Sequence, residues 1–387
     1  MRRPRRYAIV ALLVLTAALV TLTVSAALRD STPPQLYVEA PARLAVGAPL
    51  GLFVSADEPV TYTLEYGGER HELIEQDATF TVPALAGAQL ASLSAVDGAG
   101  NETLHESLIV GVPTLEPVLQ VAEIVTSGDP IGLHVLALPA ADADPVTNAK
   151  VTDISLQVNG AAIPLRQEGA AYRGMLASPM TVDDSTIEAH LTVVDEFARR
   201  YDVTTPIVLE PLPVAVEQLR LSAATLSVIT PEGRTLEAET SARILAGANP
   251  DPLWTAPFIM PIEGVSTSGF GDARRYEQGG PASFHYGLDL AAPQGTPIHA
   301  TNDGVVVVAG AYPIKGGWVA IDHGDGLISH YFHMWQVDAV VGQQVHRGDV
   351  IGFVGTTGLS TGPHLHWEMR VRGAASNPFA WVGKTYP

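Results

Sequence analysis

The sequence of 387 residues contains no cysteine. This absence excludes disulfide frameworks, cysteine-ligated zinc, iron–sulfur clusters and thiol nucleophiles. Charged residues are also scarce, at 16% of the chain against a usual share of ~25%. Lys and Arg together number 22 and Asp and Glu number 41, which gives a formal net charge of −19. Because nucleic-acid binding depends on basic surface, we expect no nucleic-acid partner.

Global disorder is excluded by the apolar content, since 47% of the residues are hydrophobic. Glycine (36) and proline (29) are frequent, which suits turn-rich β structure better than helical bundles. At about 150 residues per domain, a chain of this length forms two or three domains. We therefore expect a mainly β protein of several domains.

The N-terminus combines positive charge with a long apolar stretch. Four arginines lie within residues 1–6, and residues 7–28 carry no charge. A helix of these 22 residues is about 33 Å long, enough to cross a hydrocarbon layer of ~30 Å. The sequence therefore predicts a membrane anchor over residues 1–28, with the N-terminus inside and the bulk of the chain extracytoplasmic.

A cleaved signal peptide is the alternative interpretation of the same stretch. Val24-Ser25-Ala26 is a loose match to a small-residue cleavage site. The apolar stretch is longer than the ~7–15 residues usual in signal peptides, which favours a retained anchor. A cleaved chain would be secreted or periplasmic, so both interpretations export the rest of the protein.

Two blocks, residues 29–113 and 114–212, show the alternation of half-buried strands. Apolar residues occupy every second position at 60–66 and again at 187–193. Asn159-Gly160 is a signal for a type I′ hairpin turn. The segment Ala95–Asn101 resembles strand ends of bacterial immunoglobulin-like domains. We expect two Ig-like β-sandwich domains, in which the scattered histidines have structural or surface roles; these are His71, His105, His134 and His190.

Residues 213–256 predict a short, partly helical connector that packs on the last domain. Thr230 can cap a helix that has Pro231 in its first turn, and Gly247 can end it. From residue 257 to the C-terminus, short apolar runs alternate with glycines. This pattern predicts a C-terminal all-β domain over 257–387.

Histidine is concentrated in this last domain, where eight of the 12 lie between positions 285 and 366. Two groups stand out, His285 with Asp289 and His364 with His366. Residues two apart on a strand share one face, so His364 and His366 point together while Leu365 points to the core. Zinc prefers imidazole nitrogen and carboxylate oxygen, so the two groups predict a metal site.

Several spaced motifs in this domain resemble the M23 peptidases of the lysostaphin or LytM type. The resemblance covers about residues 262–380, roughly a third of the chain. It rests on the stretches His285–Ile298, Tyr331–Met334 and Gly355–Glu368. It departs at Phe270–Arg275, where family members often have Phe-Gly-x-Arg and this chain has one residue more. The departure affects the expected substrate preference and leaves the metal motifs intact.

The resemblance implies roles for five residues. His285, Asp289 and His366 correspond to the ligands of one zinc ion per chain. His333 and His364 correspond to an unligated catalytic pair beside the activated water, and which of them is the base stays open. A zinc site of this kind lowers the pKa of a water from 15.7 to about 7.

The family implies a zinc endopeptidase that hydrolyses peptide cross-links of peptidoglycan, which fits an exported chain. A bond between D-Ala and a diamino acid is the preferred target, and a glycyl–glycine bridge is the alternative. Some relatives lose zinc ligands and instead bind and activate a cell-wall amidase, so a non-catalytic regulator is the rival function. A wall-binding scaffold built on the β-sandwich domains is a second rival. All five implied positions are intact here, which favours the enzyme.

Overall fold

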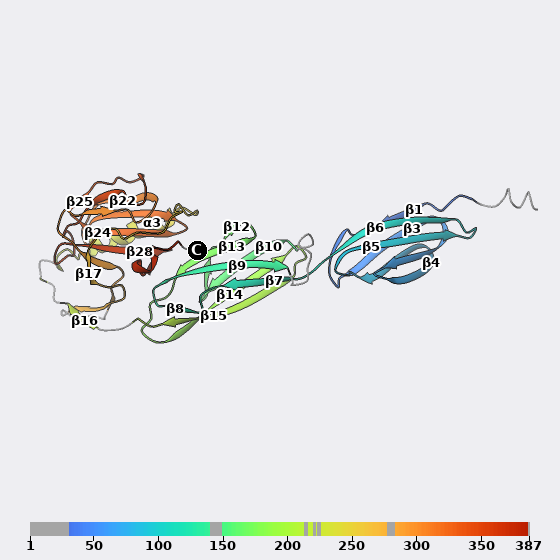
Figure 1. Cartoon of the computed structure of the whole chain (residues 1–387), viewed down its shortest axis with the longest axis horizontal. Helices are drawn as coiled ribbons and strands as arrows, with labels where there is room; N and C mark the ends of the chain where they lie inside the picture. The colour runs from blue at the N-terminus through green and yellow to red at the C-terminus, as the bar shows by residue number, and fades with distance from the viewer. Residues whose placement is uncertain are drawn as a thin grey trace, which may run out of the picture. The chain divides into compact units, whose positions relative to one another are not determined.

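The computed structural model describes residues 31–139, 149–212, 216–219, 222, 226–276 and 283–385. It is built mainly from β-strands, as the sequence predicts (Figure 1). The first β block belongs to one compact unit. Most of the second β block, the connector and the C-terminal block belong to another.

The first β block forms a single six-stranded sheet with the order β1-β3-β5-β6-β2, in which β4 also pairs with β3. Strand β3 has a register shift between Ser55 and Val60; its first half pairs with β1 and its second half with β5. Both halves contribute to one apolar core. The strands are β1 (Leu36–Glu39), β2 (Arg43–Ala45), β3 (Pro49–Tyr66), β4 (Glu69–Pro83), β5 (Gly87–Asp97) and β6 (Glu102–Val112).

The second β block contains two sheets, ordered β11-β10-β14-β15-β8 and β12-β13-β9-β7. Asn159 and Gly160 have φ values of 49° and 78°, the left-handed pair that a type I′ turn requires, so the predicted hairpin is confirmed. The strands are β7 (Leu115–Gln120), β8 (Ile124–Thr126), β9 (Pro130–Pro139), β10 (Val151–Val158), β11 (Ala161–Ile163), β12 (Arg166–Glu168), β13 (Ala171–Ala177), β14 (Ser185–Asp195) and β15 (Arg200–Glu210).

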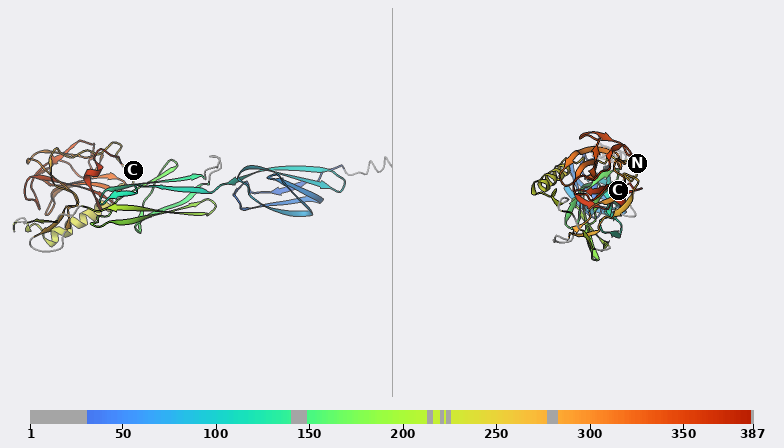
Figure 2. Two further views of the ribbon diagram at one scale, coloured as in Figure 1. Left: turned by 60° about the horizontal axis from the view of Figure 1, so that its bottom comes forward. Right: turned by 90° about the vertical axis from the view of Figure 1, so that its left-hand side faces the viewer.

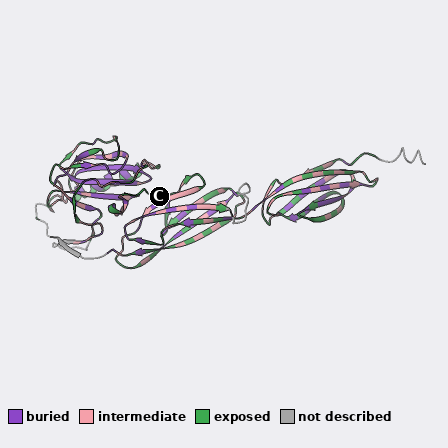
Figure 3. Cartoon of the chain, viewed as in Figure 1, coloured by how far each residue is buried: buried purple, intermediate pink, exposed green. Residues whose placement is uncertain are grey.

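Burial alternates along the strands of both blocks, as Figure 3 shows by its bands of colour. This alternation is the two-sided pattern read from the sequence. The classification of the blocks as Ig-like stays a prediction. The expected anchor over residues 1–28 lies outside the described residues, and within them no helix is both long and apolar enough to cross a membrane.

Helix α3 (Pro231–Ala246) lies in the predicted connector and begins and ends where the sequence indicates. Thr230 caps it by accepting a hydrogen bond from the Gly233 N–H, and Gly247 follows its last turn. Ile244 packs with Trp318 and Phe332 on one face of the C-terminal sheet. Figures 1 and 2 show α3 beside this sheet. The helix is therefore part of the packing of the last domain.

The C-terminal block is organised around an eight-stranded sheet with the order β17-β20-β28-β24-β23-β22-β26, in which β29 pairs with β28. Two three-stranded sheets, β16-β18-β19 and β21-β27-β25, are formed by strands that mostly alternate with those of the large sheet along the chain. The elements are β16 (Val216–Leu219), β17 (Val265–Ser268), β18 (Ala273–Tyr276), β19 (Ser283–Phe284), β20 (Leu288–Ala291), β21 (Pro297–His299), β22 (Gly304–Tyr312), β23 (Gly316–Gly324), β24 (Leu327–Met334), β25 (Gln336–Val337), β26 (Gln344–Val345), β27 (Val350–Phe353), β28 (His364–Val371), β29 (Ala374–Ser376) and the 3-10 helix η2 (Pro378–Trp381).

The two faces of the eight-stranded sheet carry different side chains. One face packs the main apolar core, which includes Leu365 and Trp367 of β28. The other face carries the remaining alternate residues of β28, beginning with His364 and His366, and α3 packs on this same face. The polar residues of β28 and the connector helix therefore share one side of the sheet.

His323 is buried in this block with 0% exposure. Its Nδ1–H donates to the Asp303 carbonyl at 2.7 Å, and Nε2 lies 2.8 Å from the Ser329 hydroxyl. Burial lowers the pKa of His323 from 6.5 to about 4. The imidazole is therefore neutral in the folded protein at pH values where it is already charged in the unfolded chain.

This burial predicts a pH-dependent stability. Between pH 6.5 and about 4 the unfolded chain binds the proton more readily, so the free energy of unfolding falls as the pH falls. The contribution of His323 amounts to about 3 kcal/mol across that window. Calorimetric midpoints should drop less between pH 7 and pH 5 in His323→Gln than in the wild-type chain, while the exposed His346→Gln should keep the wild-type slope. If the midpoint changed equally with pH in all three proteins, His323 would not be the source of the pH dependence.

Candidate metal centre and catalytic groove

Three donor atoms meet on the polar face of the sheet. The Oδ1 atom of Asp289 lies 2.7 Å from Nδ1 of His366 and 3.2 Å from Nε2 of His285. The two imidazole nitrogens are 3.0 Å apart. Ligands at ~2.0–2.1 Å from a tetrahedral zinc are about 3.3 Å from each other, so these separations suit one ion. The predicted ligands are brought together within the described residues.

Strand pairing explains the convergence. Strands β20 and β28 are antiparallel neighbours, and Asp289 stands directly opposite His366. Directly opposed residues project from the same face of a sheet, about 5 Å apart at Cβ. His285 precedes β20, and its backbone N–H donates to the Asp272 carbonyl at 2.9 Å. The ligand set is thus held by two strands and the segment before the first of them.

Hydrogen bonds on the outer side of each imidazole fix its tautomer. Nδ1–H of His285 donates to the Gly269 carbonyl at 2.8 Å, which leaves Nε2 to face the other donors. Nε2–H of His366 donates to Glu368 at 3.1 Å, which leaves Nδ1 facing them. Ligand histidines in proteins are oriented by such outer partners. Both metal-side nitrogens can therefore offer a lone pair.

The charges in the cluster are strongly coupled. Burial acts to raise the pKa of Asp289, but hydrogen bonds from His285 and His366 outweigh it and hold that pKa well below its ordinary value. Burial acts to lower the pKa of His366, while Asp289 and Glu368 raise it to about 9. An incoming cation must therefore displace a proton from His366, so the affinity for metal rises with pH.

Glu368 contacts the donor cluster but is not among the five residues to which the family resemblance gives roles. It is buried and contacts both His366 and Arg370, whose Nε donates to it at 2.8 Å. Burial acts to raise the pKa of Glu368, and the charges of Arg370 and His366 lower it well below its ordinary value. The carboxylate stays ionised and orients His366. Its position two residues after His366 on the same strand face was the available signal.

Arg274 is a second residue whose role the sequence did not reveal. Its guanidinium donates to the outer oxygen of Asp289 at 2.9 Å, and it also contacts the Ser268 hydroxyl. It belongs to the segment Phe270–Arg275, where this chain departs from the family pattern. The extra residue thus still allows an arginine to reach the metal-side carboxylate.

His333 and His364 lie together beside the three donors. Their ring centres are 4.8 Å apart, and the ring centre of His333 is 6.0 Å from that of His366. Nε2 of His364 is 3.8 Å from Asp289, farther than the nitrogens of the donor cluster. Both side chains are placed next to the cluster, outside the group of three donor atoms.

Both of these imidazoles are held in one tautomer by backbone carbonyls. Nδ1–H of His333 donates to Thr357, and Nδ1–H of His364 donates to Gly362, each at 2.8 Å. Each therefore keeps Nε2 free to accept a proton. Burial and the nearby charges of His366 and His364 lower the pKa of His333 to about 3, so it stays neutral over the physiological range.

A β-bulge aims His333 into the cluster. The register of β23 and β24 shifts between the pairs Val319↔Tyr331 and Gly317↔Met334, so two residues of β24 oppose Trp318. His333 has φ = 61°, in the left-handed region, and its N–H donates to the Lys315 carbonyl at 2.9 Å. Bulges redirect side chains in this way. Regular alternation would have turned His333 away from His366.

A groove of about 320 Å³ passes over these residues. Its walls come from the segment around His285, from β24 and β28, from the loop before β23, and from α3. The residues that line it are Glu237, Arg274, Ser283, Phe284, His285, Tyr286, Ile314, Lys315, Phe332, His333, Leu359, His366 and Glu368. The groove therefore exposes His285 and His366 of the donor cluster and one of the two other imidazoles, His333.

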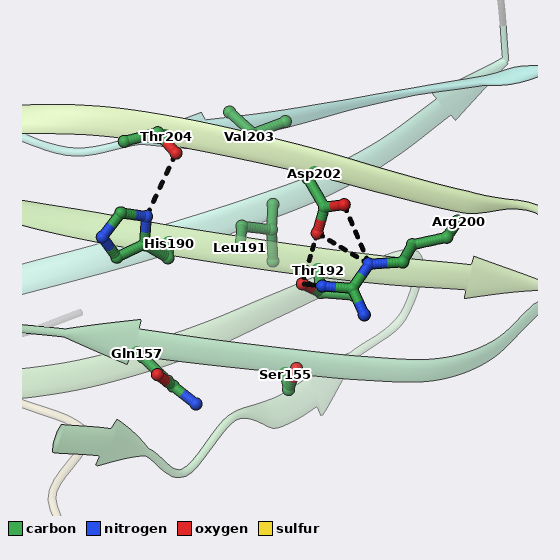
Figure 4. Close-up of a pocket in the computed structure, with 9 residues that line it drawn as sticks. All are labelled: Ser155, Gln157, His190, Leu191, Thr192, Arg200, Asp202, Val203 and Thr204. Carbon is green, nitrogen blue, oxygen red and sulfur yellow. Dashed lines mark hydrogen bonds and ion pairs between the residues drawn. The ribbon is translucent and has the colours of Figure 1, made fainter. Parts of the chain in front are cut away.

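Another hollow, of about 340 Å³, lies on the second β block (Figure 4). Nδ1 of His190 is 3.1 Å from the Thr204 hydroxyl, and Thr192 donates to Asp202 at 2.7 Å. Arg200 forms an ion pair with Asp202 at 2.8 Å. These polar groups satisfy one another on an open sheet face, which agrees with the surface role expected for His190.

Comparison with known proteins identifies the domain that holds the site. Residues 283–378, which hold all five predicted site residues, match the model of peptidase family M23. The chain carries an M23 peptidase domain. Its resemblance to the LytM type, read from the sequence, is thereby confirmed.

The M23 domain is similar to curated relatives from bacteria. Over 93 residues it is 45% identical to the peptidoglycan DD-endopeptidase ShyA of Vibrio cholerae serotype O1, which covers 24% of this chain and 22% of that protein. Over 95 residues it is 48% identical to the DD-carboxypeptidase/endopeptidase Mpg of Neisseria meningitidis serogroup B, with the same shares covered.

The match to ShyA and Mpg covers only part of these two proteins. The matched part spans about a fifth of their length. A solved putative M23 peptidase from Pseudomonas aeruginosa is similar over 61% of this chain and 90% of its own, at 26% identity and a TM-score of 0.44.

Proposed function

We propose that the chain is a zinc endopeptidase that hydrolyses peptide cross-links of peptidoglycan. The observation that carries this proposal is the pairing of a three-donor cluster with two imidazoles whose Nε2 atoms are free. His285, Asp289 and His366 would hold the zinc ion, which supplies a Lewis acid and activates a water when bound. Two neutral nitrogens and one carboxylate match the donor set of catalytic zinc sites, which leave a position open.

The remaining steps belong to side chains of this chain. His333 and His364 have lone pairs on Nε2, so either can accept the proton of the attacking water and pass it to the leaving amine. A protonated imidazole at either position also stabilises negative charge on the scissile carbonyl oxygen. Glu368 keeps His366 oriented. The groove residues align the peptide so that its carbonyl carbon meets the water.

The proposed bond joins D-Ala to a diamino acid in a cross-link, and a glycyl–glycine bridge is the alternative. The names of the relatives ShyA and Mpg, both described as endopeptidases, support the first choice. A regulator that activates a cell-wall amidase is the rival function. The complete set of five site residues supports hydrolysis instead, because a regulator has no need of them.

We further propose that the protein acts outside the cytoplasm, anchored by residues 1–28 or released after cleavage. The arginines before the apolar stretch support an exported chain. The substrate is extracytoplasmic as well. Retention of the full chain in washed membranes at high salt would identify the anchor, and a product starting near Ala27 would identify a cleaved signal peptide.

Digestion of purified peptidoglycan tests the activity. Mass spectrometry of the muropeptides should show cross-linked dimers converted to monomers, and the new termini name the bond. A chelator should stop the reaction and added zinc should restore it. An inactive protein that accelerates a purified wall amidase would instead establish the regulator.

A further inference from the structure

Helix α3 delivers a buried carboxylate to the groove from outside residues 283–378. Glu237 is 4% exposed. Its Oε1 accepts the backbone N–H groups of Ile314 at 2.7 Å and Lys315 at 2.9 Å. Its Oε2 lies 3.3 Å from Nζ of Lys315. One side chain thus fixes two successive amides and the ammonium of the loop before β23.

That loop holds the backbone of His333. The β-bulge removes the His333 N–H from the ladder, and the Lys315 carbonyl accepts it at 2.9 Å. A left-handed φ at a residue other than glycine is costly and persists only when its surroundings impose it. Lys315 supplies that constraint on one side, and Glu237 holds Lys315 in place.

The same loop also supports the imidazole of His333. Nδ1–H of His333 donates to the carbonyl of Thr357. The hydroxyl of Thr357 accepts the Gly317 N–H at 2.9 Å, and the Leu359 N–H donates to the Ile314 carbonyl at 2.7 Å. The loop around 357 is therefore tied to the loop that Glu237 fixes. The backbone N–H and the Nδ1–H of His333 both donate to this pair of loops.

Glu237 is the charged residue on the buried face of α3. The buried stripe of α3 is Gly233, Glu237, Thr240 and Ile244, so a carboxylate occupies a position where an apolar side chain would pack. Burying a carboxylate is unfavourable unless its acceptors are used. Here three donors use them, and all three belong to Ile314 and Lys315.

We propose that Glu237 is a positioning residue for His333. The connector helix α3 would thus supply a side chain that the active site needs. The proposal rests on the peptidase function proposed above. It acts through a chain of contacts: Glu237 fixes Lys315, and Lys315 fixes the His333 backbone. Loss of Glu237 leaves the metal ligands untouched and misplaces His333, one of the two imidazoles that can accept the proton.

The experiment compares variants of the full chain in steady-state hydrolysis of a soluble cross-linked peptide. Glu237→Ala should lower kcat about 10–100-fold, as loss of a supporting partner does, with KM changed by no more than about twofold. Zinc content should stay at one per chain. Glu237→Gln keeps an oxygen that can accept both amides and should recover kcat to within about fivefold of wild type. Glu239→Ala, at an exposed position of the same helix, is the matched control.

Amide hydrogen exchange gives a readout that does not need activity. In Glu237→Ala, peptides covering residues 313–317 and the amide of His333 should exchange faster than in wild type, while β28 should be unchanged. If the alanine variant does not fold, Glu237→Asp, which keeps the charge and shortens its reach, should show the same pattern. If the wild-type protein were inactive, the proposed peptidase function would be refuted. The exchange measurement would then still test whether Glu237 positions His333. Wild-type values of kcat and of amide exchange in Glu237→Ala would overturn the positioning role. Loss of zinc together with a large change in KM would overturn it as well.

Discussion

Asp289→Ala should lose its metal and reduce peptide hydrolysis to background. Asp289 supplies the anionic donor of the cluster and lies 2.7 Å from His366. In the wild-type chain the Arg274 guanidinium lies 2.9 Å from the Asp289 carboxylate, and the alanine variant removes that carboxylate. A cation would then approach an uncompensated positive charge, which is unfavourable at such short range. Metal analysis of the purified full chain and turnover of cross-linked peptide measure the two effects.

Two further variants test whether loss of the Asp289 charge causes the loss of metal and activity. Asp289→Asn keeps the shape of the side chain and removes its charge, so it should also lose most of the metal. Asp202→Ala removes a carboxylate that pairs with Arg200 on the second β block, and it should keep both metal and activity. Stoichiometric zinc with full hydrolysis in Asp289→Ala would mean that another residue is the third ligand.

The second large effect is expected from the two free imidazoles. His333→Ala and His364→Ala should each keep the metal and lose about 10²–10⁴-fold in kcat, the usual contribution of acid–base catalysis. Both side chains have Nδ1–H committed to a backbone carbonyl, so Nε2 is the atom whose loss matters. The double variant should be little worse than either single one, because both serve the same proton transfers.

Metal content tests whether His366 is the ligand and His364 the catalytic residue, or the reverse. His366→Ala should lose zinc, whereas His364→Ala should not, although the two residues are neighbours on one strand face. The exposed His346→Ala serves as the control for general effects of histidine removal. If His364→Ala lost zinc and His366→Ala retained it, the assignment of ligand and catalytic histidine on β28 would be reversed.

Local sequence patterns determined the secondary structure and several side-chain directions of this protein. Alternating apolar residues predicted the half-buried strands, and Asn159-Gly160 predicted the turn between β10 and β11. Thr230 and Gly247 marked the ends of α3. The even spacing of His364 and His366 placed them on one face, opposite Leu365. These features depend on backbone preference and on the period of a strand or helix, which a sequence displays directly.

The tertiary structure alone decided which distant groups meet. Strand pairing set Asp289 opposite His366, and a register of one residue more or less would have turned the carboxylate to the core. A β-bulge turned His333 toward the cluster, against the alternation of its strand. Packing of α3 brought Glu237 to Lys315, 78 residues further along the chain. Spacing along a chain does not encode such contacts, because they depend on how separate elements pair and pack.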